Sequence, residues 1–571
     1  MHWRKYVHTL ANVIRKLFYS ILLLTLAASC AQQGTISGGE KDTTPPRILE
    51  SSPQNGALNF TGNEWFFEFD EYVRVAGAQK ELLVTPPLMY PVEFKMRGKK
   101  VTLVWQDTLL EETTYMFQFG DGIVDVNESN PLDSNVFVFS TGDYLDSFYL
   151  NGRVIDAFTL KPMEDIWVML YPEDQDSLPY KKLPRYFART DENGRYSLRY
   201  LAEGTYKVFA LQPVNNGYLY DQPDEAIAFL QGMYSSRSPA DSTAEDLEDL
   251  RLFLEEDTLQ YIADYEQVGN RGLSFQFNRP AEKWSIEEIN GQDISRWDSI
   301  WNDERDSLVY WFAEPWDYDS LHLSVDLDGF LDTLYLRKPS TGNKGKERGK
   351  QQVEERLKLQ ASSTAKIAHY KTFSLNSETP LRNFNWVDAL LIEAQDSMEL
   401  APYVVVEDRR VIIDYPWKQG EKYRFFIPDS AITDRFGLTN DTLKYNLTAT
   451  KVEDFGTFQL NYNLPEQGHP YLLQLQQSDG KVLQEDQVQP TGTITYEYLK
   501  TGSYKLKILF DENGNGKWDT GNYLRGEQPE EVAFFDQAID LRSNWVTEID
   551  WDFKGVGEEE VQGEEPGSTS E

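Results

Sequence analysis

The amino-acid sequence predicts an all-β fold made of several β-sandwich domains in tandem. Short segments rich in aromatic and β-branched residues recur along the chain, and Gly, Pro, Asn and Asp separate them. Aromatic residues make up 13% of the chain, which is enough to fill packed cores. A chain of 571 residues is also too long for one hydrophobic core, so several domains are expected.

The clearest strands are predicted in the first quarter of the chain. They are Trp65 to Phe69, Val101 to Trp105, Tyr115 to Phe119 and Val136 to Phe139. Few segments carry a helical period. Asp241 to Glu255 is one candidate helix, although its acidic composition also suits a loop.

Residues 1–29 have the layout of a secretory signal. A basic stretch precedes the uncharged run Leu17 to Ala28, which is too short to span a bilayer of roughly 30 Å as a helix. Small residues then lead to Cys30, the only cysteine in the chain. Because a lone thiol in an exported protein has no disulfide partner, lipidation would explain the presence of Cys30. The alternative is an ordinary signal peptide with an incidental cysteine.

The segment Leu26 to Cys30 resembles a lipobox, with the usual leucine shifted by one place. That resemblance implies cleavage between Ser29 and Cys30 and acylation of the Cys30 thiol, which would anchor the protein in a membrane. Stable anchoring takes more than one acyl chain. Residues 30–43 are rich in Gly and Ser and are predicted to form a flexible tether.

The net charge of −38 argues against nucleic acid as a partner, since phosphate binding needs clusters of Lys and Arg. A soluble, self-repelling acidic surface is the simpler interpretation.

Two consecutive types of domain are predicted to occur twice, in the same order. Residues 99–125 and 409–434 share the order and spacing of three strand-like segments. Residues 198–208 and 496–506 match in the same way, and the segment after Pro223 is similar to the segment after Pro529.

Particular motifs carry a family resemblance. Pro45 to Ile48, Ser52 to Ala57, Phe69 to Glu71 and Asn135 to Gly142 resemble the SbsA-type bacterial Ig-like domain. Leu150 to Val154, Thr190 to Tyr196 and Gly204 to Tyr206 resemble a carboxypeptidase-regulatory-like (prealbumin-like) β-sandwich. The whole layout is similar to Ig-like-domain lipoproteins of the Bacteroidota, which implies an extracytoplasmic β-domain protein.

The expected organisation follows from the repeats and the resemblance. It comprises a lipoprotein signal peptide (1–29), a tether (30–43), an SbsA-type Ig-like domain (44–143), a carboxypeptidase-regulatory-like sandwich (147–262), a β domain of Ig-like character (265–339), a charged linker (340–362), a second Ig-like domain (365–450), a second prealbumin-like sandwich (451–554) and a disordered acidic tail (555–571). A short exposed helix is conceivable within the linker, near Gln351 to Leu359.

One loop has a ligand-like pattern. Oxygen-bearing side chains occupy positions 1, 3, 5 and 9 of a Gly-bent loop, namely Asp511, Asn513, Asn515 and Asp519. Such spacing suits Ca²⁺, which takes 6–8 oxygen ligands, but an EF-hand also needs a bidentate Glu at position 12, where this chain has Asn522. Glu527 and Glu530 lie too far along the chain to supply the missing ligand at position 12 unless the chain makes a detour. The alternative is a polar hairpin turn without metal.

A second acidic loop contains Asp121, Asp125, Asn127 and Glu128, and Asp434 and Asn440 occupy the related place in the second copy. A polar strand connection is the simpler interpretation of this loop than a metal site.

Catalysis finds little support in the sequence, and the prediction is a protein that is not an enzyme. Three histidines follow the signal segment, His322, His369 and His469, and they lack metal-type spacing. The chain has no Gly-x-Ser-x-Gly elbow, His-Glu-x-x-His motif or P-loop.

The predicted function is a membrane-anchored structural or protein-interaction module of the cell envelope, with lipid as one partner and an envelope protein as the other. The alternative is a glycan-binding, or glycan-processing, lipoprotein. Five tryptophans that would form a glycan platform are also candidates for core packing: Trp284, Trp297, Trp301, Trp311 and Trp316. Ala31 follows the cysteine, so the resemblance implies the outer membrane, on either face.

Overall fold

The computed structural model describes residues 42–77, 81–133, 135–214, 217–241, 245–257, 259–268, 271–289, 298–312, 320–337, 356–466 and 468–553. These residues form a nearly all-β protein, as predicted, with one short α-helix, α3 (Leu178–Lys181), and one 3-10 helix, η1 (Val452–Asp454). No helix in the described part of the chain is long and apolar enough to cross a membrane. The predicted signal peptide, Cys30 and most of the tether lie outside the described residues. The sheets group into five units, numbered here in chain order.

Unit 1 (residues 42–141) consists of β1 (Ile48–Ser52), β2 (Glu64–Phe69), β3 (Val73–Val75), β4 (Leu83–Thr85), β5 (Glu93–Arg97), β6 (Lys100–Val104), β7 (Thr114–Gln118), β8 (Ile123–Asp125) and β9 (Val136–Ser140). The sheets have the orders β1-β2-β6-β5, β4-β7-β9 and β3-β8. Strand β2 shows why they pack: Trp65, Phe67 and Phe69 alternate with exposed or half-buried residues and are fully buried.

Unit 2 (residues 147–257) consists of β10 (Phe148–Asp156), β11 (Trp167–Tyr171), α3, β12 (Tyr186–Arg189), β13 (Arg195–Leu201), β14 (Thr205–Gln212), β15 (Ala226–Phe229), β16 (Tyr234–Ser235) and β17 (Leu250–Leu252). One sheet has the order β13-β10-β17 and the other β12-β11-β14-β15, with β16 also on β14.

Unit 3 (residues 259–337) consists of β18 (Ile262–Val268), β19 (Gly272–Phe277), β20 (Trp284–Glu288), β21 (Asp298–Trp301), β22 (Ser307–Trp311), β23 (Ser320–Leu327) and β24 (Phe330–Arg337). Its sheets have the orders β18-β19-β22-β21 and β20-β23-β24. Buried residues from both sheets share one hydrophobic core, as expected for a sandwich.

Unit 4 (residues 356–450) consists of β25 (Leu359–Ala361), β26 (Lys366–Ile367), β27 (Phe373–Ser377), β28 (Leu381–Phe384), β29 (Leu390–Glu393), β30 (Met398–Leu400), β31 (Tyr403–Glu407), β32 (Arg410–Asp414), β33 (Lys422–Ile427), β34 (Ile432–Asp434) and β35 (Leu443–Ala449). The sheet orders are β25-β27-β32-β31, β26-β35-β33-β29-β30 and β28-β34.

Unit 5 (residues 451–553) begins with η1 and consists of β36 (Gly456–Asn463), β37 (Tyr471–Gln477), β38 (Val482–Val488), β39 (Thr491–Leu499), β40 (Gly502–Phe510), β41 (Val532–Phe534), β42 (Ile539–Leu541) and β43 (Val546–Asp552). The sheet orders are β39-β36-β43 and β38-β37-β40-β41, with β42 on β40.

Two of the five units have the same sheet order. Units 2 and 5 share one topology, including the parallel pairs β10–β17 and β36–β43. Their backbones even share a detail, because Tyr200 and Tyr498 both have a φ of 57° at equivalent positions before the last strand residue. A bulky residue seldom adopts this left-handed conformation, so chance does not account for the coincidence.

Two expectations about local structure are corrected. The candidate helix at Asp241 to Glu255 contains strand β17, where Leu250 and Leu252 are buried in the core of unit 2. The predicted linker 340–362 ends sooner than expected, because β25 pairs with β27 and Leu357 is buried in the core of unit 4. Residues 338–355, which include most of the linker, and residues 554–571 lie outside the described part of the chain.

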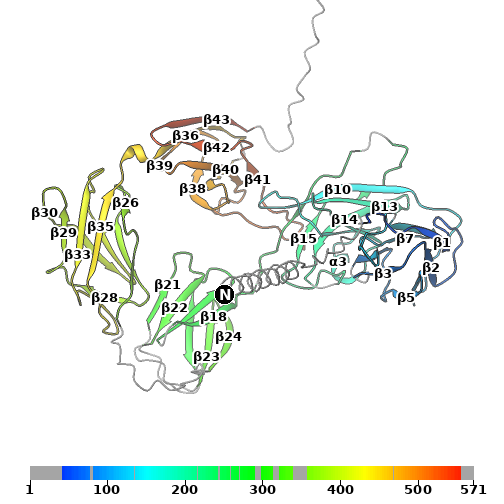
Figure 1. The fold of residues 1–571 in the computed structure, drawn as a ribbon, viewed down its shortest axis with the longest axis horizontal. Helices are drawn as coiled ribbons and strands as arrows, with labels where there is room; N and C mark the ends of the chain where they lie inside the picture. Colours follow the sequence, from blue (N-terminus) through cyan, green and yellow to red (C-terminus); the bar gives the residue numbers. More distant parts are fainter. Residues whose placement is uncertain are drawn as a thin grey trace, which may run out of the picture.

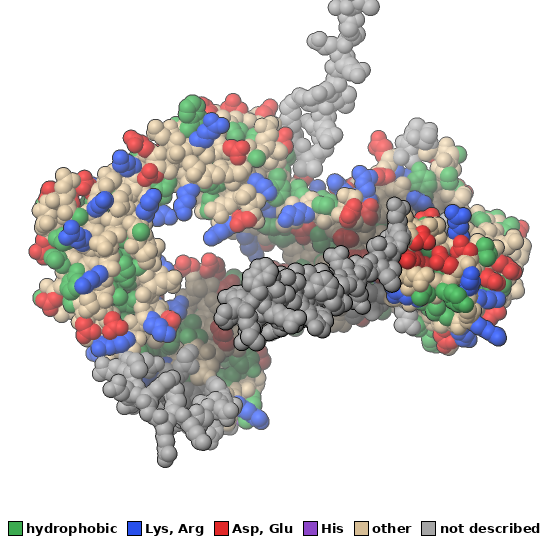
Figure 2. Space-filling view, in the orientation of Figure 1, with side chains coloured by type: hydrophobic (Ala, Val, Ile, Leu, Met, Phe, Trp, Pro, Cys, Tyr) green, Lys and Arg blue, Asp and Glu red, His purple; other side chains and the backbone are tan. Residues whose placement is uncertain are grey.

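The five units do not form a straight string. Figure 1 shows units 2 to 5 following one another around a ring, so that unit 5 returns to lie beside unit 2. Unit 1 packs on unit 2, where the Thr85 hydroxyl donates to the Phe187 carbonyl (2.9 Å). Figure 2 shows acidic and basic side chains interspersed over the visible face of the molecule.

Candidate functional site

The predicted calcium loop is the first half of a long connection between β40 and β41. This connection, residues 511–531, is called the hook here. Asp511 is fully buried at its start, and its two carboxylate oxygens accept hydrogen bonds from the backbone N–H groups of Asn515 (3.0 Å) and Gly516 (2.9 Å). This pattern is an Asx-type turn, which needs no metal to form.

The other three predicted ligands also lie together in the structure. The side-chain amides of Asn513 and Asn515 both donate to one carboxylate oxygen of Asp519. Lys517 Nζ lies 3.3 Å from the other oxygen of Asp519. The structure therefore brings together the four residues that the sequence singled out, but their polar atoms bond to one another.

The carboxylate of Glu530 closes the hook, although its distance in sequence argued against it. It accepts hydrogen bonds from the backbone N–H groups of Glu512 and Asp519, both at 2.9 Å. Burial is the main cause of a raised pKa for Glu530, and the nearby Asp519 and Asp511 charges add to it. Glu225 performs the same task in unit 2, where it accepts from the N–H groups of Asp221 and Gln222. The sequence signal that could have identified Glu530 is its distance from the strand that follows, since Glu225 precedes Phe229 by four residues and Glu530 precedes Phe534 by four.

Within the described residues, no group of three or more His, Cys, Asp or Glu side chains is arranged to hold a metal ion. The hydrogen bonds of the hook account for its shape, and calcium at Asp511, Asn513, Asn515 and Asp519 stays a prediction.

The second half of the hook inserts an aromatic side chain into unit 2. The Tyr523 ring lies 5.5 Å from the Phe209 ring, 5.2 Å from the Phe229 ring and 5.9 Å from the Tyr180 ring, between centroids. Tyr523 is 3% exposed, and burial raises its pKa. Its backbone N–H donates to Glu255 Oε1 (2.6 Å), and its hydroxyl donates to the Asp176 carbonyl. The hydrophobic cluster around it also includes Leu83, so it joins units 1, 2 and 5.

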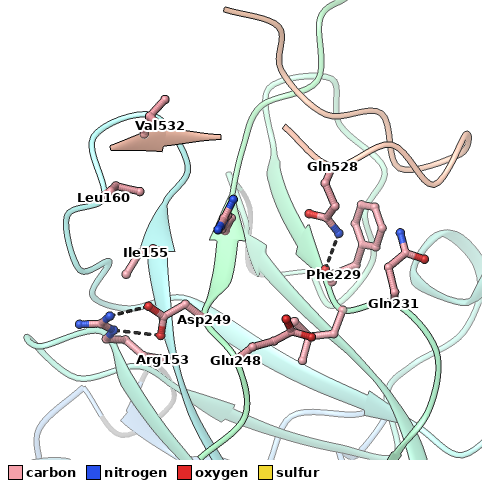
Figure 3. Close-up of a pocket in the computed structure, with 11 residues that line it drawn as sticks. Arg153, Ile155, Leu160, Phe229, Gln231, Glu248, Asp249, Gln528 and Val532 are labelled. Atoms are coloured by element: carbon pink, nitrogen blue, oxygen red, sulfur yellow. Dashed lines mark hydrogen bonds and ion pairs between the residues drawn. The ribbon is translucent and has the colours of Figure 1, made fainter. Parts of the chain in front are cut away.

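Polar contacts surround this anchor. Gln528 Nε2 donates to the Phe229 carbonyl (2.8 Å), and Arg251 pairs with Glu531 (3.3 Å). Figure 3 shows the cavity of about 720 Å³ that lies under this part of the hook, with the Arg153–Asp249 ion pair at one side and Gln528 at the other. Both arginines of the cavity are engaged, Arg153 by Asp249 and Arg251 by Glu531, and Glu248 accepts a hydrogen bond from the Tyr234 hydroxyl.

The loop that follows β8 has a structural role. Asp125 is 1% exposed, and its carboxylate accepts hydrogen bonds from the N–H groups of Glu128 (2.6 Å), Ser129 (3.1 Å) and Asn130 (2.8 Å). Asp434, its counterpart in unit 4, accepts from the N–H groups of Phe436 and Leu438. The two buried aspartates therefore shape their own loops.

Two of the described tryptophans of unit 3 pack against its core, and the third, Trp311, is buried where its ring lies 6.0 Å from the Phe436 ring of unit 4. Trp311 is 3% exposed, while Trp284 and Trp301 are half-buried against the core and cross each other at 5.8 Å between centroids. Trp297 and Trp316 lie outside the described residues. The packing of Trp284 and Trp301 matches the core alternative, and Trp311 is buried against unit 4, so these three rings do not form a flat glycan platform.

Two of the described histidines, His322 and His369, pack against tyrosine rings, and His369 Nδ1 also lies 3.3 Å from Thr450 Oγ1. The His322 ring packs 4.3 Å from the Tyr335 ring, and the His369 ring contacts Tyr370 and Tyr498 where units 4 and 5 meet. These contacts give both histidines a packing role.

Comparison with known proteins identifies one part of the chain. Residues 42–141 match the model of a bacterial Ig-like domain, which corresponds to unit 1. No curated protein matches the chain.

The solved structures that match this chain share little sequence with it and superpose on it poorly. The Bacillus anthracis TIE protein has 8% identity over 91% of this chain and 76% of its own, with a TM-score of 0.13. The S-layer protein rSbsC(31-844) has 10% identity over 84% of this chain and 67% of its own, with a TM-score of 0.14. The BSP domain of a biofilm associated protein has 11% identity over 90% of this chain and 99% of its own, with a TM-score of 0.14. Scores this low carry no inference about function.

Proposed function

We propose that this chain is a lipid-anchored structural or protein-interaction module of the bacterial cell envelope. More specifically, we propose that the chain is an SbsA-type Ig-like-domain lipoprotein of the Bacteroidota and that acylated Cys30 holds it in the outer membrane. The match of residues 42–141 to a bacterial Ig-like domain supports the class of module. The lipobox-like sequence before Cys30 supports the anchor.

The insertion of Tyr523 into unit 2 is the observation that carries this proposal. A string of β-sandwiches on flexible linkers would present its surfaces in many relative orientations. Here the buried Tyr523 side chain and the Arg251–Glu531 pair tie unit 5 to unit 2, although units 3 and 4 lie between them in the chain. A chain fixed in this way presents surfaces of several units to a partner in one geometry, and this preorganisation favours binding.

The anchor and the first ordered residues define where such a surface would stand. The side-chain amide of Asn130 donates to the Asp42 carbonyl (3.0 Å), which fixes the start of unit 1. Residues 30 to 42 span at most about 40 Å when fully extended. The proposal therefore places unit 1 next to the membrane and the ring of units 2 to 5 beyond it.

Crosslinking in whole cells, followed by capture of the tagged chain from detergent-solubilised membranes, tests the proposal. We expect one or more envelope proteins to be enriched with the wild-type chain and with Leu524→Ala, a substitution at an exposed hook residue. The partner should be lost with Tyr523→Ala, which frees unit 5 from unit 2. The proposal would be contradicted if a Cys30→Ala chain and an unrelated tagged lipoprotein both captured the same envelope proteins as the wild-type chain, in equal amounts.

A further inference from the structure

A lysine is buried on the outer face of unit 5, where the duplication leads one to expect an aromatic residue. In strand β40, Tyr504, Leu506 and Ile508 enter the core, so the alternate residues Lys505, Lys507 and Leu509 face outward. Lys507 pairs with Phe534 across β41, as Phe209 pairs with Phe229 in unit 2. Lys507 therefore stands at the position that Phe209 fills in the first copy.

The ammonium group of Lys507 lacks the partner that a buried charge normally has. Lys507 is 1% exposed. Among the described residues no carboxylate forms an ion pair with it, and its contacts are the Phe158 ring, 2.8 Å from Nζ to the centroid, and the Phe534 ring at 5.5 Å. Phe158 belongs to the turn that follows β10 in unit 2, so the face of its ring covers Lys507. Burying a cation without an ion pair is unfavourable, and such residues cluster at functional sites.

Lys507 lines a cavity of about 640 Å³ between units 2 and 5, which is separate from the cavity under the hook. Lys161 of unit 2 and Lys505 of unit 5 line the same cavity, as do the rings of Phe158, Phe534 and Phe535. Two carboxylates, Asp479 and Asp536, complete its charged lining. Three lysines around one cavity stand out in a chain whose net charge is −38.

We propose that this cavity binds a small molecule in which a phosphate or carboxylate group is attached to an aromatic or apolar body. The anionic group would pair with Lys507, with Lys161 and Lys505 adding donors, and the three phenylalanine rings would enclose the apolar body. Because the walls come from two units, a bound molecule would also strengthen the contact between unit 2 and unit 5.

The charge state of Lys507 fits such a ligand. Burial lowers the pKa of Lys507 to about 7, against the smaller opposing effects of Asp156 and Glu485. At neutral pH the amine is therefore close to half protonated, and an incoming anion favours the charged form. Glu485 lies on β38 and is itself engaged by Gln474 (2.6 Å).

Titration of the purified full-length chain in detergent tests the proposal, with phenyl phosphate and benzoate as probes and benzyl alcohol as the neutral control. We expect one of the two anions to bind and the alcohol not to bind, which also identifies the preferred anionic group. Lys507→Met should weaken binding by at least about tenfold. Lys444→Met is the matched control, since Lys444 is an exposed lysine over a phenylalanine ring in unit 4.

Two further variants keep the test decisive if Lys507→Met misfolds. Lys507→Phe restores the residue of the first copy, so we expect a higher melting temperature together with loss of binding. Lys505→Met changes an exposed wall residue and should weaken binding several-fold while the melting temperature stays the same. Unchanged affinity in all three variants, or no binding of either anion to the wild-type chain, would overturn the proposal and leave Lys507 as a cation–π contact between the two units.

Discussion

The ring of Tyr523 packs edge-on against the ring of Phe229, 5.2 Å between centroids, although the two residues belong to units that are not consecutive in the chain. Truncation of Tyr523 to Ala removes a buried aromatic side chain, which typically costs about 3–5 kcal/mol. We expect unit 5 to detach from unit 2 while its own β-sandwich stays folded. Limited proteolysis should then cleave the hook, which the wild-type chain protects.

Leu524→Ala is the control for this prediction, because Leu524 is the next residue and is 68% exposed. It should leave the proteolysis pattern unchanged. Protection of the hook in both variants would show that Tyr523 is not the anchor.

The buried Asp125 is expected to stabilise unit 1 at neutral pH. Burial alone raises the pKa of Asp125, but the backbone N–H groups of Glu128, Asn130 and Ser129 together outweigh burial and the pKa is lowered. A lowered pKa means that the stabilisation is present above the ordinary value of 3.8 and is lost as the pH falls through the folded value.

Thermal unfolding of Asp125→Asn checks this expectation. Its melting temperature should be lower than that of the wild-type chain at pH 7, and the difference should shrink as the pH falls below 3.8. The exposed Asp121→Asn serves as control. A pH-independent difference would assign the effect to packing of the amide rather than to the charge.

The sequence predicted the local structure better than the contacts between distant segments. Alternation of buried aromatics located β2 around Trp65 to Phe69, since a half-buried strand has a period of two. The docking of Tyr523 was not predictable, because no local pattern tells which unit an exposed loop will meet. Glu530 was set aside for the same reason: its role depends on how the hook folds back, and spacing along the chain does not report that.

Burial also explains the errors in secondary structure. Leu250 and Leu252 lie in an acidic stretch that suggested a helix, but tertiary packing of these two side chains in unit 2 stabilises a strand. Leu357 lies in a charged segment that suggested a linker. Because its side chain is buried in the core of unit 4, that unit begins earlier in the chain than predicted.

The hook is expected to keep its shape without calcium. Asp511, Asp519 and Glu530 already accept hydrogen bonds from groups of the hook, so its loop is satisfied by its own donors. A chelator should therefore leave the proteolytic protection of the hook unchanged. Protection that falls in chelator, returns with Ca²⁺ and is absent in Asp519→Asn would restore the calcium site.

Removal of the predicted anchor should change the location of the chain. With Cys30→Ala the acyl chains cannot attach, and each buried lipid CH₂ contributes about 0.8 kcal/mol to membrane binding. We expect the variant in the soluble fraction after cell lysis and the wild-type chain in the membrane fraction. Membrane residence of Cys30→Ala would point to a partner protein as the anchor.

The most direct test of the fixed arrangement is small-angle X-ray scattering of the Cys30→Ala chain, with and without Tyr523→Ala. If unit 5 is tied to unit 2, the chain with Tyr523 has the smaller radius of gyration and a scattering curve that fits a closed ring, while Tyr523→Ala gives a larger, more extended particle. An extended particle with the same radius of gyration in both chains would contradict the account.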